Sequence, residues 1–96
     1  MKIFNKKIKY SGLISTDTLI GGTSKGHLTL DNCSVIINGM HKGTINCTPN
    51  SKLEVNGMLK GTITNSGGYV KITGIINGKV NTITGKTIID ETAIIK

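Results

Sequence analysis

Four side chains in this sequence are of types that commonly do chemistry, namely two histidines and two cysteines. His27 and His41 could serve as general acids or bases, and Cys33 and Cys47 as nucleophiles or metal ligands. Their spacing matches no metal-binding pattern, and the chain has no Ser-His-Asp order, HExxH motif or catalytic carboxylate pair. Residues 85–87, Gly-Lys-Thr, lack the upstream glycine of a phosphate-binding loop and are better interpreted as a turn. The sequence therefore predicts a protein that is not an enzyme and holds no metal or cofactor.

Lysine is the other chemically distinctive residue. All 12 basic residues are lysine, only 5 residues are acidic, and the formal net charge is +7. Such a charge favours acidic partners, either nucleic acid or anionic lipid, although lysines also keep strand-rich proteins soluble. Because contacts to phosphates and base edges usually use arginine, nucleic acid is the less favoured partner. Lys25, Lys42 and Lys60 recur at equivalent positions and form a candidate basic stripe, with a solubilising edge as the simpler alternative.

The first ten residues differ from the rest of the chain. Four of them are lysine, and apolar residues lie between these lysines. Ile3, Phe4, Lys6 and Lys7 are candidates for contact with an anionic membrane surface, where apolar side chains enter the interface and lysines meet head groups. A frayed tail or one irregular strand is the alternative. Without a long apolar stretch, the segment is neither a signal peptide nor a transmembrane helix. We expect a flexible lysine-rich leader over residues 1–10 and one folded domain over residues 11–96.

A repeat runs through most of the chain and must position these side chains. Its clearest copy is NGMLKGTIT at residues 56–64, which follows NGMHKGTIN at 38–46 and precedes TGIINGKVN at 73–81. Paired glycines fall at 22/26, 39/43, 57/61 and 74/78, so the period is 17 or 18 residues. A short fixed period is the signature of a solenoid. The abundance of Ile, Val, Thr, Asn and Gly favours strands and tight turns over helices.

Aligned repeats place apolar residues in columns. The columns are Thr18, Val35, Leu53 and Val70; Ile20, Ile37, Val55 and Ile72; Leu28, Ile45, Ile63 and Val80; and the less apolar Leu30, Cys47, Asn65 and Thr82. Residues two apart share one face of a strand, so these columns should point inward and stack between successive turns of the chain. A single turn cannot bury its apolar side, and its neighbours must cover it. The predicted fold is all-β, a single-stranded parallel β-helix of about five rungs of 17–18 residues.

Corners and ends complete the predicted solenoid. Asn-Gly pairs at 38–39 and 56–57 are typical of corners, where the chain needs positive φ or no side chain. The pattern weakens after Asn81, although Thr87–Ile89 and Ala93–Ile95 can supply a last partial rung. Terminal rungs would expose unpaired backbone and an apolar cross-section, which favours pairing with another molecule. We therefore expect assembly end to end.

The repeated (Asn/Thr)-Gly-x-x-x-Gly-x-(Ile/Val) motif, its spacing of 17 to 18 residues and the lysine-bearing apolar leader resemble the bactofilin family of bacterial cytoskeletal proteins. The resemblance covers about residues 11 to 90. It implies a right-handed parallel β-helix and polymerisation without nucleotide into filaments that have no directional polarity. In many members of the family it also implies an N-terminal membrane-targeting segment. The chain departs from the family in lacking a proline-rich C-terminal tail and in its weak first rung.

Three functions can be compared on this basis. The favoured one is a structural, self-assembling cytoskeletal protein whose main partner is itself, located in the cytoplasm and in contact with the inner face of the cell membrane. The alternative is a monomeric β-solenoid binding module for an acidic partner. An acyltransferase that uses His27 or His41 is the least favoured, because left-handed β-helix enzymes have a six-residue apolar repeat and the columns here lie about eight residues apart. Cys33 and Cys47 are expected to be reduced thiols.

Overall fold

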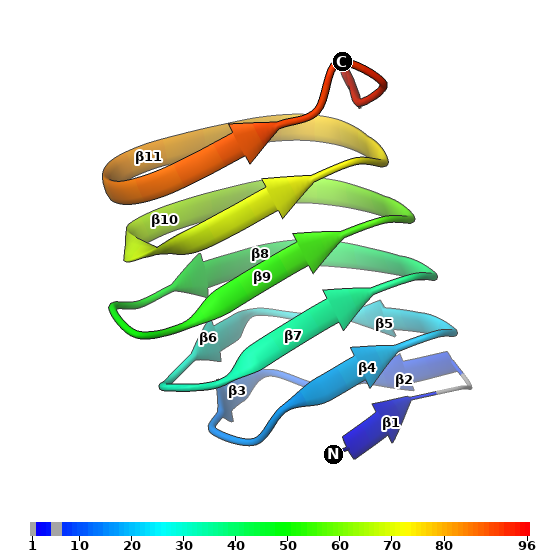
Figure 1. Cartoon of the computed structure of the whole chain (residues 1–96). Helices are drawn as coiled ribbons and strands as arrows, with labels where there is room; N and C mark the ends of the chain where they lie inside the picture. Colours follow the sequence, from blue (N-terminus) through cyan, green and yellow to red (C-terminus); the bar gives the residue numbers. More distant parts are fainter. Residues whose placement is uncertain (1, 5–6) are drawn as a thin grey trace.

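The structure, a computed structural model, describes residues 2–4 and 7–96 and contains no helix in them. Its strands are β1 (Lys2–Phe4), β2 (Lys7–Lys9), β3 (Gly12–Ile14), β4 (Thr18–Ile20), β5 (Thr23–Lys25), β6 (Leu28–Leu30), β7 (Ser34–Ile37), β8 (Met40–Cys47), β9 (Lys52–Val55), β10 (Met58–Ile72), β11 (Ile75–Ile89) and β12 (Ile94–Ile95). All strand pairs are parallel. The predicted all-β parallel solenoid of about five turns is confirmed (Figure 1).

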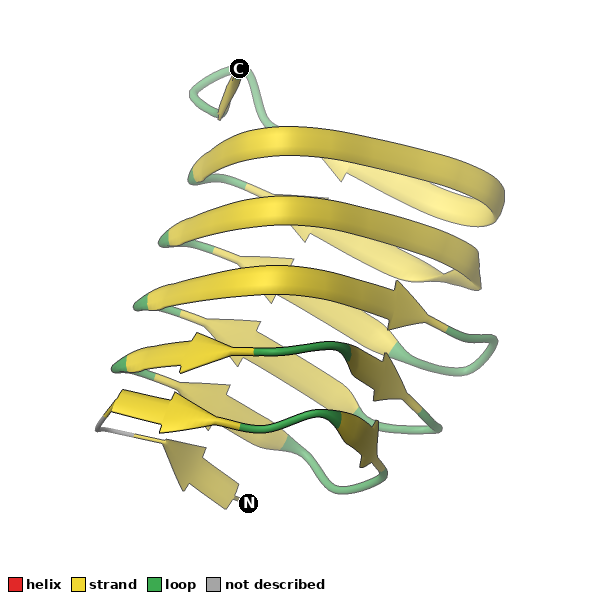
Figure 2. Cartoon of the chain, turned by 180° about the vertical axis from the view of Figure 1, so that it is seen from behind, coloured by secondary structure: helices red, strands yellow, loops and turns green. Residues whose placement is uncertain are grey.

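Each turn of the coil has three sides, which we call faces 1, 2 and 3 in chain order. Face 1 contains β1, β4, β7 and β9, followed by the ends of β10 and β11. Face 2 contains β2, β5, the first parts of β8, β10 and β11, and β12. Face 3 contains β3, β6 and the middle segments at residues 44–47, 62–65 and 79–82. The near strands in Figure 1 run left to right, the distant ones run right to left and the chain climbs, so the coil is right-handed. Figure 2 shows faces 2 and 3 from behind.

The strand register confirms the predicted columns. On face 1, Val35 pairs with Leu53 and Leu53 pairs with Val70, steps of 18 and 17 residues. The last partial rung also forms as predicted, since Thr87–Ile89 lies on Val70–Ile72 and Ile94–Ile95 lies on Ile75–Ile76. The sequence repeat therefore corresponds to the stacking of one coil on the next.

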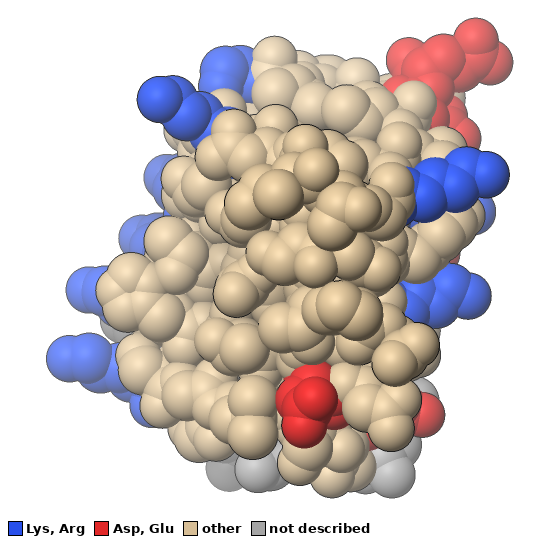
Figure 3. All heavy atoms as spheres, turned by 90° about the vertical axis from the view of Figure 1, so that its left-hand side faces the viewer, with Lys and Arg blue, Asp and Glu red and all other residues tan. Residues whose placement is uncertain are grey.

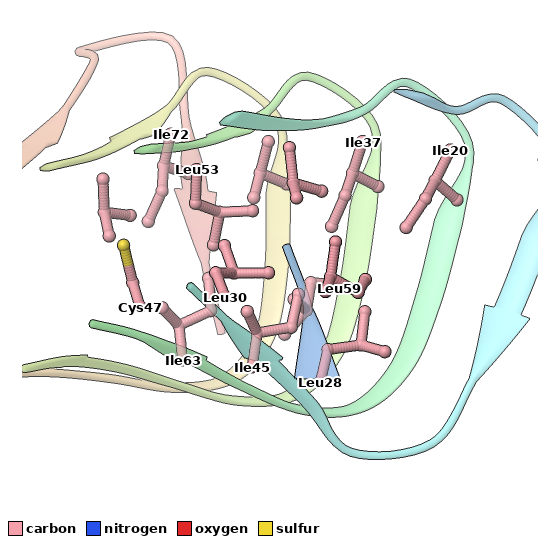
Figure 4. Close-up of a cluster of buried hydrophobic side chains, with 14 of the residues drawn as sticks. Ile20, Leu28, Leu30, Ile37, Ile45, Cys47, Leu53, Leu59, Ile63 and Ile72 are labelled. Atoms are coloured by element: carbon pink, nitrogen blue, oxygen red, sulfur yellow. The ribbon is translucent and has the colours of Figure 1, made fainter. Parts of the chain in front are cut away.

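The inward columns make one continuous core (Figure 4). Ile20, Ile37, Val55 and Ile72, which stack on face 1, are all 0% exposed. Burying a side chain of this size contributes about 1.5–3 kcal/mol relative to leaving it exposed. Because each coil covers the inward side chains of the next, the core can be exposed to solvent only at the two terminal coils.

Gly57 and Gly61 show two different reasons for glycine in the repeat. Gly61 has a φ of +142°, and a Cβ there would lie 1.9 Å from the carbonyl oxygen of Gly43 in the preceding coil. Gly57 is outside the positive-φ region, yet its Cβ would lie 2.0 Å from the oxygen of Gly39. The Asn-Gly pairs do mark corners as predicted, and of the two reasons expected for them, positive φ or no side chain, only the second applies at Gly57. The close stacking of backbones at this corner excludes a side chain.

Asparagine shapes the corner between faces 3 and 1. Asn32 and Asn50 adopt φ values of 50° and 66°, a conformation that asparagine tolerates better than most residues. Asn65 is 0% exposed, and its Oδ1 accepts a hydrogen bond of 2.8 Å from the Gly68 amide. Its Nδ2 donates to the Lys86 carbonyl at 2.9 Å, which links this corner to the last coil.

The described part of the leader continues the solenoid. β1 pairs with β4 and β2 pairs with β5, so these strands add to faces 1 and 2. Phe4 pairs with Ile20 and is only 8% exposed. The sheet thus extends to both sides of residue 10, and the division of the chain into a leader and a domain stays a prediction.

Candidate functional site

The predicted basic stripe is a continuous column on face 2. Lys25 pairs with Lys42, Lys42 pairs with Lys60, and all three side chains are exposed. Lys9, also exposed, pairs with Lys25 and extends the column by one coil. Sequence reasoning missed Lys9 because it precedes the first glycine pair and lies 16 residues, not 17 or 18, from Lys25. We call Lys9, Lys25, Lys42 and Lys60 the lysine ladder.

The ladder concentrates like charges. Neighbouring strands of a sheet lie about 4.8 Å apart, so each lysine has another directly beside it, and like charges in such positions repel. In Figure 3 lysine side chains project from the left edge of the molecule at successive heights, and others project from its right edge. On face 1, by contrast, Glu54 and Lys71 are register partners, but no ion pair joins them. An anionic partner would relieve the repulsion along the ladder.

Two of the four candidate membrane-contact residues, Ile3 and Phe4, lie on opposite sides of β1. Ile3 is 53% exposed on face 1, whereas Phe4 points inward at 8% exposed. Lys7 belongs to β2 and pairs with Thr23, and Lys6 lies outside the described residues. Their contact with a membrane stays a prediction.

His41 is buried in the core of face 2. It is 0% exposed and occupies the column of Leu59, as the alignment of repeats indicated. Its Nδ1 lies 2.6 Å from the Ser24 hydroxyl and its Nε2 lies 3.0 Å from the Gly26 carbonyl. Desolvation by burial lowers the pKa of the imidazole. Nε2 must carry the proton to donate to a carbonyl, so the neutral ring accepts the Ser24 hydroxyl at Nδ1. Sequence reasoning aligned His41 correctly but did not identify Ser24 as its partner.

His27 and the two cysteines make hydrogen bonds of their own, separate from the Ser24–His41 pair. His27 is exposed, and its Nδ1 makes a hydrogen bond with the Thr44 hydroxyl of the next coil. Cys33 and Cys47 are buried free thiols whose pKa values are raised by burial. The Cys33 thiol donates to the Ile14 carbonyl at 3.2 Å. These hydrogen bonds join neighbouring coils, which gives His27 and Cys33 a structural role.

The C-terminal coil is open. Ile89 is 48% exposed and Ile95 is 42% exposed, although the residues beneath them in the same columns, Ile72 and Ile76, are 0% exposed. Over residues 79–89, β11 pairs with β10 on one side and with no described strand on the other. This coil therefore presents both apolar side chains and a free strand edge.

The N-terminal coil has a free edge but a better-sealed core. Each of β1, β2 and β3 pairs with a single described strand. Phe4 and Ile14, two inward residues of this coil, are 8% and 6% exposed. The two ends therefore offer similar backbone edges and different amounts of apolar surface.

Comparison of the chain with protein-family models, curated proteins and solved structures found no match. Within residues 2–4 and 7–96, no helix has the length and apolar character needed to cross a bilayer. In the same residues, no group of three or more His, Cys, Asp or Glu side chains is placed to hold a metal ion. The solenoid surfaces and ends therefore carry the functional argument.

Proposed function

We propose that this protein is a structural, self-assembling protein that polymerises end to end through its terminal coils without nucleotide, as the resemblance to bactofilins implies. A location in the cytoplasm, with contact to the inner face of the cell membrane, belongs to the same proposal. The observation that carries it is the open C-terminal coil, where Ile89 and Ile95 are about half exposed beside the free edge of β11. A second copy that adds its own strand edge there would cover both features.

The proposal is tested by light scattering and negative-stain electron microscopy of the purified chain without nucleotide. We expect elongated polymers for the natural sequence and none for Ile89→Lys. Because Ile89 is 48% exposed, its lysine can reach water, so the variant should fold. Ile36→Lys, on the outer side of β7, is the matched control and should still polymerise. A natural chain that remains monomeric at high concentration in low and high salt would contradict the proposal.

The lysine ladder supports a second function, the binding of an acidic partner by the monomer. Four exposed lysines from four successive coils lie in one column. Electrostatic binding of this kind weakens steeply with salt. Titration with a soluble polyanion over a range of salt concentrations would detect it, and a weak, salt-independent interaction would exclude it.

A further inference from the structure

Face 2 carries a second column beside the lysine ladder. In β5 and in the first parts of β8, β10 and β11, the second residue points inward, and the residues on either side of it point outward. One outward column is the lysine ladder. The other consists of Thr23, Met40, Met58, Ile75 and Ile94, which are successive register partners. We call Met40, Met58, Ile75 and Ile94 the apolar ladder.

The two ladders run parallel along the solenoid. Residues two apart in a strand are separated by about 6.5–7 Å, and successive coils by about 4.8 Å. Beyond the apolar ladder lies a shallow groove lined by glycines of the repeat, including Gly39, Gly57 and Gly74, together with Met40 and Met58. Because these glycines have no side chains, they add no bulk beside the apolar ladder. A flat partner can therefore reach the methionines and the lysines together.

The charge on face 2 has one sign. None of the 5 acidic residues lies in its strands. Asp17 and Asp31 lie outside the strands, Glu54 is on face 1, and Asp90 and Glu91 lie between β11 and β12. The lysines therefore have no acidic neighbour within the face that would compete with an external anion.

We propose that face 2 binds an anionic lipid bilayer, with the apolar ladder entering the interface and the lysine ladder contacting the lipid phosphates. Apolar side chains flanked by lysines are the combination that interfacial binding uses, and methionine adapts readily to an irregular apolar environment. A soluble polyanion would occupy the lysines but would leave the apolar ladder in water. A second copy of face 2 would bring two lysine ladders together, which like charges oppose. The proposal deepens the proposed function by naming the surface that faces the membrane, and it holds for a monomer as well as for a polymer.

The sequence contains no tryptophan, so a single introduced indole can report on each face. We place it by Met58→Trp on face 2 and by Thr64→Trp on the outer side of face 3. With phosphatidylglycerol/phosphatidylcholine vesicles, Met58→Trp should show a blue-shifted emission and Thr64→Trp should not. Both variants also carry Ile89→Lys, so that a failure of end-to-end assembly does not affect the result. Equal shifts at both positions, or a shift only at position 64, would overturn the proposal.

The charge requirement is tested with a pair of variants that have the same net charge. Each lysine near an anionic membrane strengthens binding about fivefold, so Lys42→Gln/Lys60→Gln should lower the partition coefficient about 25-fold. Lys52→Gln/Lys86→Gln removes two exposed lysines from face 1 and should change it less than about threefold. An equal loss in both variants would mean that charge alone, not face 2, determines binding. Binding of soluble polyphosphate in place of vesicles, with the same loss in Lys42→Gln/Lys60→Gln, would assign the surface to a polyanion and refute the lipid proposal.

Discussion

The most constrained single side chain is His41. It lies in a column that Leu59 and Ile76 occupy in later coils, and it is 0% exposed. Its ring nitrogens contact Ser24 and the Gly26 carbonyl, and burial disfavours the charged ring more than the Gly26 and Thr44 hydrogen bonds favour it. The charges on the surrounding strands are those of Lys25, Lys42 and Lys60, and no acidic side chain lies in the described strands of this face. His41 therefore makes the fold sensitive to acid.

The first prediction concerns this sensitivity. Burial lowers the pKa of His41 in the folded protein, so below its ordinary value of about 6.5 the unfolded chain binds a proton that the folded chain does not. The free energy of unfolding should be constant above about pH 7 and should fall as the pH drops below 6.5. Urea denaturation at a series of pH values between 8 and 5 measures this decline.

Ser24→Ala/His41→Leu is the control for this effect. It replaces the polar pair by residues of the type found in later coils, so the fall in stability below pH 6.5 should become much smaller. A decline of the same size in the double variant would show that another group is responsible. The alignment had already placed His41 in the column of Leu59 and Ile76, but the partner could not be predicted, because Ser24 lies in the least similar copy of the repeat.

At the scale of the structural element, two glycines distinguish two energetic costs of a side chain. One is the cost of an unfavourable backbone conformation, and the other is the cost of a clash with the neighbouring coil. Gly12 and Gly61 have the same φ of +142°. A Cβ at Gly12 would meet nothing closer than 3.6 Å, whereas one at Gly61 would lie 1.9 Å from the Gly43 oxygen. Gly12→Ala should therefore cost about 1–3 kcal/mol for the conformation alone. Gly61→Ala should cost several kcal/mol more, as measured by thermal or urea denaturation. Equal losses would mean that the coils can separate locally to admit a methyl group.

Asn65 is a buried polar residue in a column that has Leu30 and Cys47 in earlier coils. Its side chain binds the Gly68 amide and the Lys86 carbonyl, so a nonpolar replacement would leave buried backbone groups unpaired. Asn65→Cys, which installs the residue of the preceding coil, should destabilise the fold by about 2–4 kcal/mol, since each unsatisfied group costs about 1–3 kcal/mol. Denaturation monitored by circular dichroism measures this loss. A change below 0.5 kcal/mol would show that water or another group replaces the amide.

Most of the strands and their register could be predicted from the sequence, because coils that stack on one another bring residues one repeat period apart into contact. The columns through Ile20 and Leu28 followed directly from the spacing of the glycines. The short first coil, formed partly by β1 and β2, did not, because it has 16-residue steps and no glycine pair. At position 57 the need for a residue without a side chain was predicted, but the Gly39 carbonyl oxygen that imposes it was not, because close approach of another coil leaves no local signal in the sequence.

For the whole molecule, the open C-terminal coil is the feature that bears most directly on assembly. The sequence could predict that the ends of a solenoid expose strand edges, since every coil must pair above and below. It could not predict that the two ends differ, because that depends on Phe4 filling one cross-section while Ile89 and Ile95 remain half exposed at the other. The lysine column was predicted from the sequence, but the face that combines it with the apolar ladder was not, because that required the register that places Met40 beside Met58 and Ile75 beside Ile94.

The last prediction follows from the linkage between assembly and folding. If copies join through their terminal coils, assembly stabilises the folded state, and the midpoint of thermal unfolding must rise with protein concentration. We expect a rise of several degrees over a hundredfold range for the natural chain and none for Ile89→Lys, whose added charge would be buried in the joint without a partner. Ile36→Lys should retain the rise, because it lies on the outer side of face 1 and away from both ends. A midpoint independent of concentration in the natural chain would place the protein among monomeric solenoids and leave the lysine ladder as the basis of its function.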